Sequence, residues 1–226
     1  MTMGFYVPPE QLIKDRADFA RKGIARGRSI AAMRYADGIL MMGANPSGSL
    51  HKISEVYDRV AFAGVGRFNE FESLRVAGIR YADVKGFSYG RSDVTGKGLA
   101  NAYSQTLGQI FTHENKPYEV EVLVAEIEET TDEDNLYRVQ FDGTLRHERD
   151  FAALGGKDDE LRERLAGDFD RDRDLAATVR VLAGTIEEVE EGSVAAGDWE
   201  AAVLDRRLER RKFRRLSAEE ITAARS

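Results

Sequence analysis

The sequence of 226 residues contains no cysteine, only four prolines and only three histidines. Without cysteine the chain cannot form disulfides, thiolate metal sites or iron–sulfur clusters, and it has no cysteine nucleophile. The histidines, His51, His113 and His147, lie too far apart in the sequence for a local metal-binding or catalytic motif. We therefore expect no metal site and no cofactor, and most simple enzyme chemistries are poorly supplied.

Basic residues are also too few for a dedicated nucleic-acid-binding protein. The chain has 33 Lys and Arg against 40 Asp and Glu, a net charge of −7, whereas phosphate contacts require a basic excess. No apolar run approaches the roughly 20 residues that span a bilayer, and the first residues, MTMGFYVPPEQ, lack the apolar stretch of a signal peptide. These absences predict a soluble, cytoplasmic protein that binds neither nucleic acid nor membrane.

The chain length fits one domain over residues 1–226 with a substantial core. Residues 1–9 contain two adjacent prolines and no periodic pattern, which is typical of a mobile terminal segment. Residues 10–26 are expected to form an amphipathic helix, because apolar residues recur there at helical spacing and basic residues lie between them. These apolar residues are Leu12, Ile13, Ala17, Phe19, Ala20 and Ile24.

The rest of the pattern alternates between groups of strands and pairs of helices. Strands are expected over residues 29–35, 39–42, 59–66, 118–127, 136–141, 199–204 and 212–216. Helices are expected over residues 68–81, 99–111, 158–165 and 172–189, and from Ser217, where a capping-box pattern begins. This order predicts an α+β fold in which two sheets stack face to face and helices cover each outer face, a four-layer αββα sandwich.

Several segments in the same order resemble the α-type subunits of the 20S proteasome, most closely those of actinobacteria. They are residues 21–29 (RKGIARGRS), 36–38 (ADG), 50–53 (LHKI), 57–58 (YD) and 64–71 (GVGRFNEF). The match continues through residues 99–103, 116–121 and 155–156, so it covers nearly the whole chain. The resemblance implies the αββα fold of amino-terminal-nucleophile hydrolases, with an extra N-terminal helix.

The resemblance also implies a function in protein degradation. Alpha-type subunits form an outer homo-heptameric ring that caps rings of catalytic β subunits, gates substrate entry and docks ring-shaped activators, including an ATPase that delivers tagged proteins. The catalytic subunits use an N-terminal threonine whose own amine is the base. The corresponding place here reads Gly27-Arg28-Ser29, inside the chain. We therefore expect a non-catalytic subunit of a threonine-type endopeptidase complex.

Individual residues acquire roles from the same resemblance. Lys52 matches the lysine that lines the pocket between neighbouring α subunits, where its ammonium receives the C-terminal carboxylate of an activator. The segment that closes the axial pore is matched by Gly4, Phe5, Tyr6, Val7, Pro8 and Pro9, without the Tyr-Asp-Arg motif of archaeal and eukaryotic relatives. The helix over residues 10–26 matches the helix at ring contacts, for which the candidate residues are Leu12, Ile13, Phe19 and Ala20.

Two other functions stay open on the sequence alone. One is an active amino-terminal-nucleophile hydrolase in which processing exposes Ser29, and the other is a stand-alone binding module of the same fold. The acidic stretches 126–134 and 187–191 are expected to be solvated surface, since neither has the ligand pattern of a calcium loop. The basic cluster 206–215 is expected to pair with acidic residues of this chain or of a neighbour.

Overall fold

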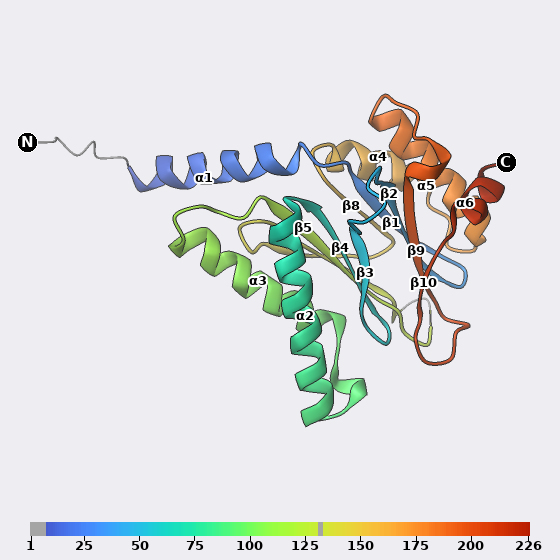
Figure 1. Ribbon diagram of the computed structural model, residues 1–226, viewed down its shortest axis with the longest axis horizontal. Helices are drawn as coiled ribbons and strands as arrows, with labels where there is room; N and C mark the ends of the chain where they lie inside the picture. Colours follow the sequence, from blue (N-terminus) through green and yellow to red (C-terminus); the bar gives the residue numbers. More distant parts are fainter. Residues whose placement is uncertain (1–7, 131–132) are drawn as a thin grey trace, which may run out of the picture.

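The computed structural model describes residues 8–130 and 133–226 and arranges their strands in two five-stranded sheets (Figure 1). Neighbouring strands in both sheets are antiparallel. The first sheet has the order β10 (Phe213–Arg215), β9 (Trp199–Asp205), β2 (Gly38–Ala44), β1 (Ile30–Tyr35) and β8 (Phe151–Leu154). The second has the order β3 (Ile53–Tyr57), β4 (Val60–Gly66), β5 (Val120–Glu126), β6 (Asn135–Val139) and β7 (Leu145–Glu148).

Helices cover the outer face of each sheet. Those on the first sheet are α4 (Asp158–Asp168), α5 (Leu175–Val189) and α6 (Ala218–Arg225), and those on the second are α2 (Phe68–Ser88) and α3 (Gly96–His113). One apolar cluster, with Met41 and Leu123, fills the space between the sheets, and a further cluster lies under each helical layer. Removing these side chains from water drives the packing. The predicted four-layer αββα sandwich is confirmed.

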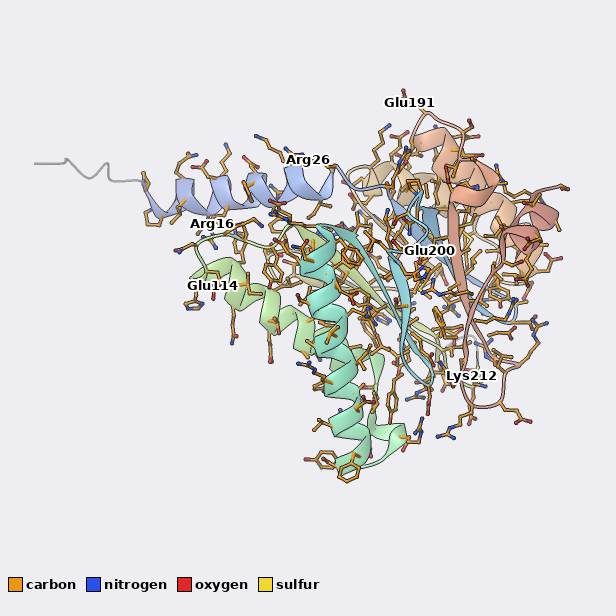
Figure 2. All side chains as sticks on the ribbon, viewed as in Figure 1. Arg16, Arg26, Glu114, Glu191, Glu200 and Lys212 are labelled. Atoms are coloured by element: carbon orange, nitrogen blue, oxygen red, sulfur yellow. The ribbon has the colours of Figure 1, made fainter. Side chains whose placement is uncertain are left out.

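The N-terminal helix α1 (Pro9–Ile24) joins the sandwich only through its second half. Ala20 and Ile24 are buried in the cluster between the sheets, whereas the first turns extend away from the body (Figure 1). The guanidinium of Arg16 donates to the carbonyl oxygens of Ile110 at 3.2 Å and Glu114 at 2.7 Å, at the end of α3 (Figure 2). The helix is therefore anchored from Arg16 onward and unsupported before it.

The structure differs from the predicted elements mainly where the apolar pattern is weak. Strand β7 reads Leu-Arg-His-Glu and lies at the edge of its sheet, where solvent replaces an apolar neighbour. Strands β3 and β8, which have five and four residues, are also absent from the predicted strands. Helix α2 continues beyond its predicted end at Tyr81 to Ser88. After β8 the chain turns at Gly155, whose φ of 119° is readily adopted by glycine.

The prediction that residues 126–134 are solvated surface is wrong for two of the acids. Glu126 is 2% exposed and Asp134 is 3% exposed, because they flank the paired ends of β5 and β6 and are covered by other parts of the chain. Asp134 accepts a hydrogen bond from Arg206 at 2.6 Å, so the prediction that the basic cluster pairs with acids of this chain is confirmed there. Within the described residues, no helix is both long and apolar enough to cross a bilayer.

Candidate functional site

Lys52 lies at the end of the loop that leads from β2 in the first sheet to β3 in the second. The loop is closed by Asn45, whose amide nitrogen donates to the carbonyl oxygen of Leu50 at 2.7 Å. The backbone nitrogen of Ser47 donates to Asn45 Oδ1 at 3.2 Å, and Ser47 Oγ accepts from the backbone of Leu50 at 3.2 Å. Local hydrogen bonds of this kind define a single loop conformation without regular secondary structure.

The ammonium of Lys52 is held by two backbone carbonyl oxygens. Lys52 Nζ donates to the oxygen of Ala44 at 3.1 Å and reaches that of Arg28 at 3.5 Å. Partial burial lowers the pKa of Lys52, while the negative charges of Glu200 and Glu190 act in the opposite direction. An ammonium carries three N–H donors, so this arrangement leaves one for a further acceptor.

The buried carboxylate of Glu200 on β9 (labelled in Figure 2) contacts the Lys52 loop. Its Oε2 accepts from the backbone nitrogen of Lys52 at 3.0 Å and from Asn45 Nδ2 at 2.6 Å. Its Oε1 accepts from the backbone nitrogen of Ile53 at 3.0 Å and from Arg215 at 2.9 Å. Sequence reasoning missed Glu200, because its partners are distant along the chain and no motif marks it.

Ser29, the nucleophile of the alternative hydrolase function, is buried at the start of the first sheet with 3% of its surface exposed. Its backbone nitrogen is part of a peptide bond and donates to Glu190 Oε1 at 2.8 Å. A nucleophile of the threonine type requires a free α-amine as its base. That chemistry would therefore require cleavage of the Arg28–Ser29 bond to free the amine of Ser29.

The structure places the four candidate ring-contact residues of α1 in two different environments. Leu12, Ile13 and Phe19 are 51%, 56% and 46% exposed, so these large apolar side chains are available to a partner. Ala20 is completely buried against the chain's own core. Its assignment as a contact residue is therefore corrected, since a neighbour cannot reach it.

A second exposed apolar surface, which sequence reasoning missed, lies at the far end of α2. Val84, Phe87 and Tyr89 are 66%, 93% and 80% exposed, and a hollow of about 620 Å³ lies beside them, lined by Tyr81 and Lys85 among others. Because the sequence predicts that this helix ends at Tyr81, the three exposed apolar residues fall outside the predicted helix. The end of α2 and the start of α1 point to different sides of the molecule (Figure 1).

The candidate gate falls mostly outside the described part of the chain. Gly4, Phe5, Tyr6 and Val7 are not among the described residues, whereas Pro8 and Pro9 are exposed at the start of α1. Among residues 8–130 and 133–226, no group of three or more His, Asp or Glu side chains is arranged to hold a metal ion.

Similarity to known proteins provides evidence about the family of this chain that is independent of its geometry. Residues 24–204 match the family described as "Proteasome subunit". A "Proteasome subunit alpha" of Thermomonospora curvata is 54% identical, over 98% of this chain and 96% of that protein. Proteins of the same name from Xylanimonas cellulosilytica and a Nocardioides species are 53% and 55% identical, over 100% and 96% of this chain and 96% and 86% of those proteins. The chain therefore belongs to the proteasome subunit family.

Proposed function

We propose that this single-domain chain is the non-catalytic α subunit of a bacterial 20S proteasome core. It forms the outer homo-heptameric ring, controls substrate entry and docks ring-shaped activators, including an ATPase, for the degradation of tagged proteins. The observation that carries the proposal is full-length similarity to proteins named proteasome subunit alpha. The chain acts in the cytoplasm, as expected for a partner of such activators.

Contacts between copies of this chain are assigned to the start of α1. Leu12 and Ile13 expose large apolar side chains on the projecting first turns of α1, and Phe19 exposes another on its anchored half. Exposed apolar side chains gathered on one element are typical of an interface between proteins. A neighbouring copy in the ring is the partner that removes them from water.

A subunit of stacked rings needs another contact surface, toward the catalytic β subunits. The exposed apolar end of α2 is assigned to this contact, because Val84, Phe87 and Tyr89 lie away from the start of α1. Two separate apolar surfaces match the two kinds of neighbour that such a position in the particle requires.

Activator docking is assigned to Lys52. Its ammonium is fixed by the carbonyl oxygens of Ala44 and Arg28, and it retains one donor for an incoming carboxylate. A charge-assisted hydrogen bond in a partly desolvated site is stronger than one between neutral groups. The terminal carboxylate of an activator is an acceptor with the required charge.

The gate is assigned to residues 1–9. This assignment rests on the family resemblance and on the position of Pro8 and Pro9 at the start of the projecting helix. Pro9 occupies the first position of α1, where its missing N–H costs no hydrogen bond.

The function is tested by co-expression with the catalytic β subunit of an actinobacterium. We expect particles of several rings by light scattering and peptide hydrolysis only when the catalytic subunit is present. A chain that stays monomeric would support the stand-alone binding module instead. A processed N-terminus at Ser29, found by mass spectrometry, would support the hydrolase.

The two contact surfaces are separated in the same preparation by cysteine cross-linking, since the natural chain has no cysteine. Labelling the Leu12→Cys variant with a benzophenone maleimide should cross-link it to another copy of this chain. The Phe87→Cys variant should cross-link to the catalytic subunit. Exchanged partners would reverse the two assignments.

A further inference from the structure

The carboxylate of Glu200 connects three separate segments of the chain around Lys52. Its donors are a side chain just after β2 (Asn45), two backbone nitrogens at the start of β3 (Lys52 and Ile53) and a side chain of β10 (Arg215). The nitrogen Nδ1 of His51 lies 3.5 Å from the same carboxylate. Strands β2 and β10 belong to the first sheet, and β3 belongs to the second. One buried carboxylate therefore joins the two sheets at this site.

The backbone of Lys52 is fixed on both sides of its Cα atom. Its N–H donates to Glu200 at 3.0 Å, and its carbonyl oxygen accepts from the backbone nitrogen of Gly64 at 3.0 Å. With both peptide groups held, the Lys52 side chain starts from a defined point. From this point its ammonium reaches the carbonyl oxygen of Ala44 at 3.1 Å.

A carboxylate is the group that this position requires. Four N–H donors point to its two oxygens at 2.6 to 3.0 Å. A glutamine amide offers a single acceptor oxygen and turns two N–H donors toward the same partners. The charge of Glu200 also counteracts the effect of burial on the pKa of Lys52, which favours the ammonium form.

We propose that Glu200 is the positioning residue of the Lys52 site: its carboxylate fixes the Lys52 backbone and so places the ammonium where an activator carboxylate binds. The role in docking rests on the function proposed for Lys52. The role in holding Lys52 rests only on the contacts of this chain, and the two can be measured separately.

The holding role is tested by lysine reactivity in particles assembled with the catalytic subunit. In the Glu200→Gln variant, acetylation of Lys52 by acetic anhydride, followed by mass spectrometry, should be severalfold faster, because the amine is released and less of it is protonated. The control is Glu55→Gln. Glu55 lies on β3, three residues after Lys52, and the substitution removes its ion pair with Arg211. Its Lys52 should react at the natural rate. An unchanged rate in Glu200→Gln overturns the proposal.

The docking role is tested with a peptide carrying the last ten residues of a ring-shaped ATPase activator, with its terminal carboxylate either free or amidated. Glu200→Gln should weaken binding of the free peptide about tenfold, the loss of one charge-assisted hydrogen bond. It should leave binding of the amidated peptide unchanged. Equal losses for both peptides, or none for either, contradict positioning of Lys52.

A double variant separates positioning from general structural damage. If Glu200 acts through Lys52, the Lys52→Ala/Glu200→Gln variant should bind the free peptide no more weakly than Lys52→Ala alone. A further loss overturns the positioning role. If Lys52→Ala itself binds with natural affinity, the docking function proposed for Lys52 fails, while the acetylation rate still decides whether Glu200 holds it.

Glu200→Asp provides the same tests if the Gln variant does not assemble. It keeps the negative charge for Arg215 and withdraws the carboxylate by one methylene from the backbone of Lys52. We expect faster acetylation of Lys52 and weaker binding of the free peptide, as for Gln. Natural values for both measurements overturn the proposal.

Discussion

The Lys52 loop and the start of α1 are two surfaces of one chain with opposite construction. Lys52 is held through its backbone and its ammonium by partners from both sheets, whereas Leu12 and Ile13 are more than half exposed beyond the last anchor at Arg16. Recognition of one carboxylate depends on where a single charge is placed, whereas apolar association depends mainly on the area removed from water. The first surface should respond to mutation through affinity and the second through assembly.

The largest effect is expected from charges on the apolar surface of α1. The double variant Leu12→Asp/Ile13→Asp should prevent ring formation, because assembly would bury unpaired carboxylates. Size-exclusion chromatography with light scattering measures the loss. Lys14→Asp, which changes the net charge by the same amount at an exposed polar position of the same helix, should assemble normally. Intact rings in the double variant would remove α1 from the interface.

Lys52→Ala should act on docking instead. Loss of a charge-assisted hydrogen bond costs about 1.5–3 kcal/mol, roughly tenfold to a hundredfold in affinity for each pocket. Because several pockets of a ring bind one activator together, degradation that depends on the activator should be abolished. Lys52→Arg should restore it only in part, since a planar guanidinium does not replace a compact ammonium. An unchanged response to the activator would contradict the assignment.

The apolar end of α2 extends the comparison to a second assembly surface. Phe87 is 93% exposed, and burying such a side chain contributes about 1.5–3 kcal/mol. Phe87→Ser should therefore reduce capture of the catalytic subunit about tenfold in a pull-down with this chain as bait. Phe87→Leu keeps most of the apolar area and should retain capture. Equal capture by all three chains would exclude this surface.

Removal of residues 1–9 tests whether this segment, which ends at the first residue of α1, obstructs substrate entry. Deletion should raise the rate of peptide hydrolysis by the assembled particle severalfold, because small substrates then enter more freely. The natural particle at equal assembly, verified by light scattering, is the reference. Unchanged or slower hydrolysis would count against a gate.

The smallest effect concerns Glu126, a buried carboxylate without the partners of Glu200. Its Oε1 accepts no hydrogen bond among the described residues and lies 3.4 Å from Arg59 Nη2. Burial raises its pKa above the ordinary 4.5, although the charge of Arg59 acts in the opposite direction. The folded state thus holds this proton more tightly than the unfolded chain, so its contribution to stability is complete below pH 4.5 and is lost as the pH rises through the raised pKa. The Tm of Glu126→Gln, which does not titrate there, should gain on that of the natural chain over this window. A constant difference at every pH, by scanning fluorimetry, would contradict this.

The sequence by itself determined the layers of the fold and the boundaries of its more regular elements. Apolar patterns located β1, β2, β4, β5, β6 and β9, whose side chains reach the apolar clusters, and the helix α1 that ends at Ile24. The capping box at Ser217 is present in full. The backbone N–H of Glu220 donates to Ser217 Oγ, and the Glu220 carboxylate accepts from the backbone N–H of Ser217. Such signals arise from residues within one or two turns of each other, so they can be read along the chain.

Only the tertiary structure decided which charged residues are buried and what they hold. Glu200 and its donor Lys52 are far apart in the sequence, and so are Asp134 and Arg206. In the sequence, Asp134 is one acid in a charged run and Glu200 is a lone charge in an apolar strand. The cost of burying a charge is offset only by partners that folding brings together, and local sequence contains no record of those partners. The placement of Lys52 and the burial of Asp134 therefore depend on how the two sheets stack.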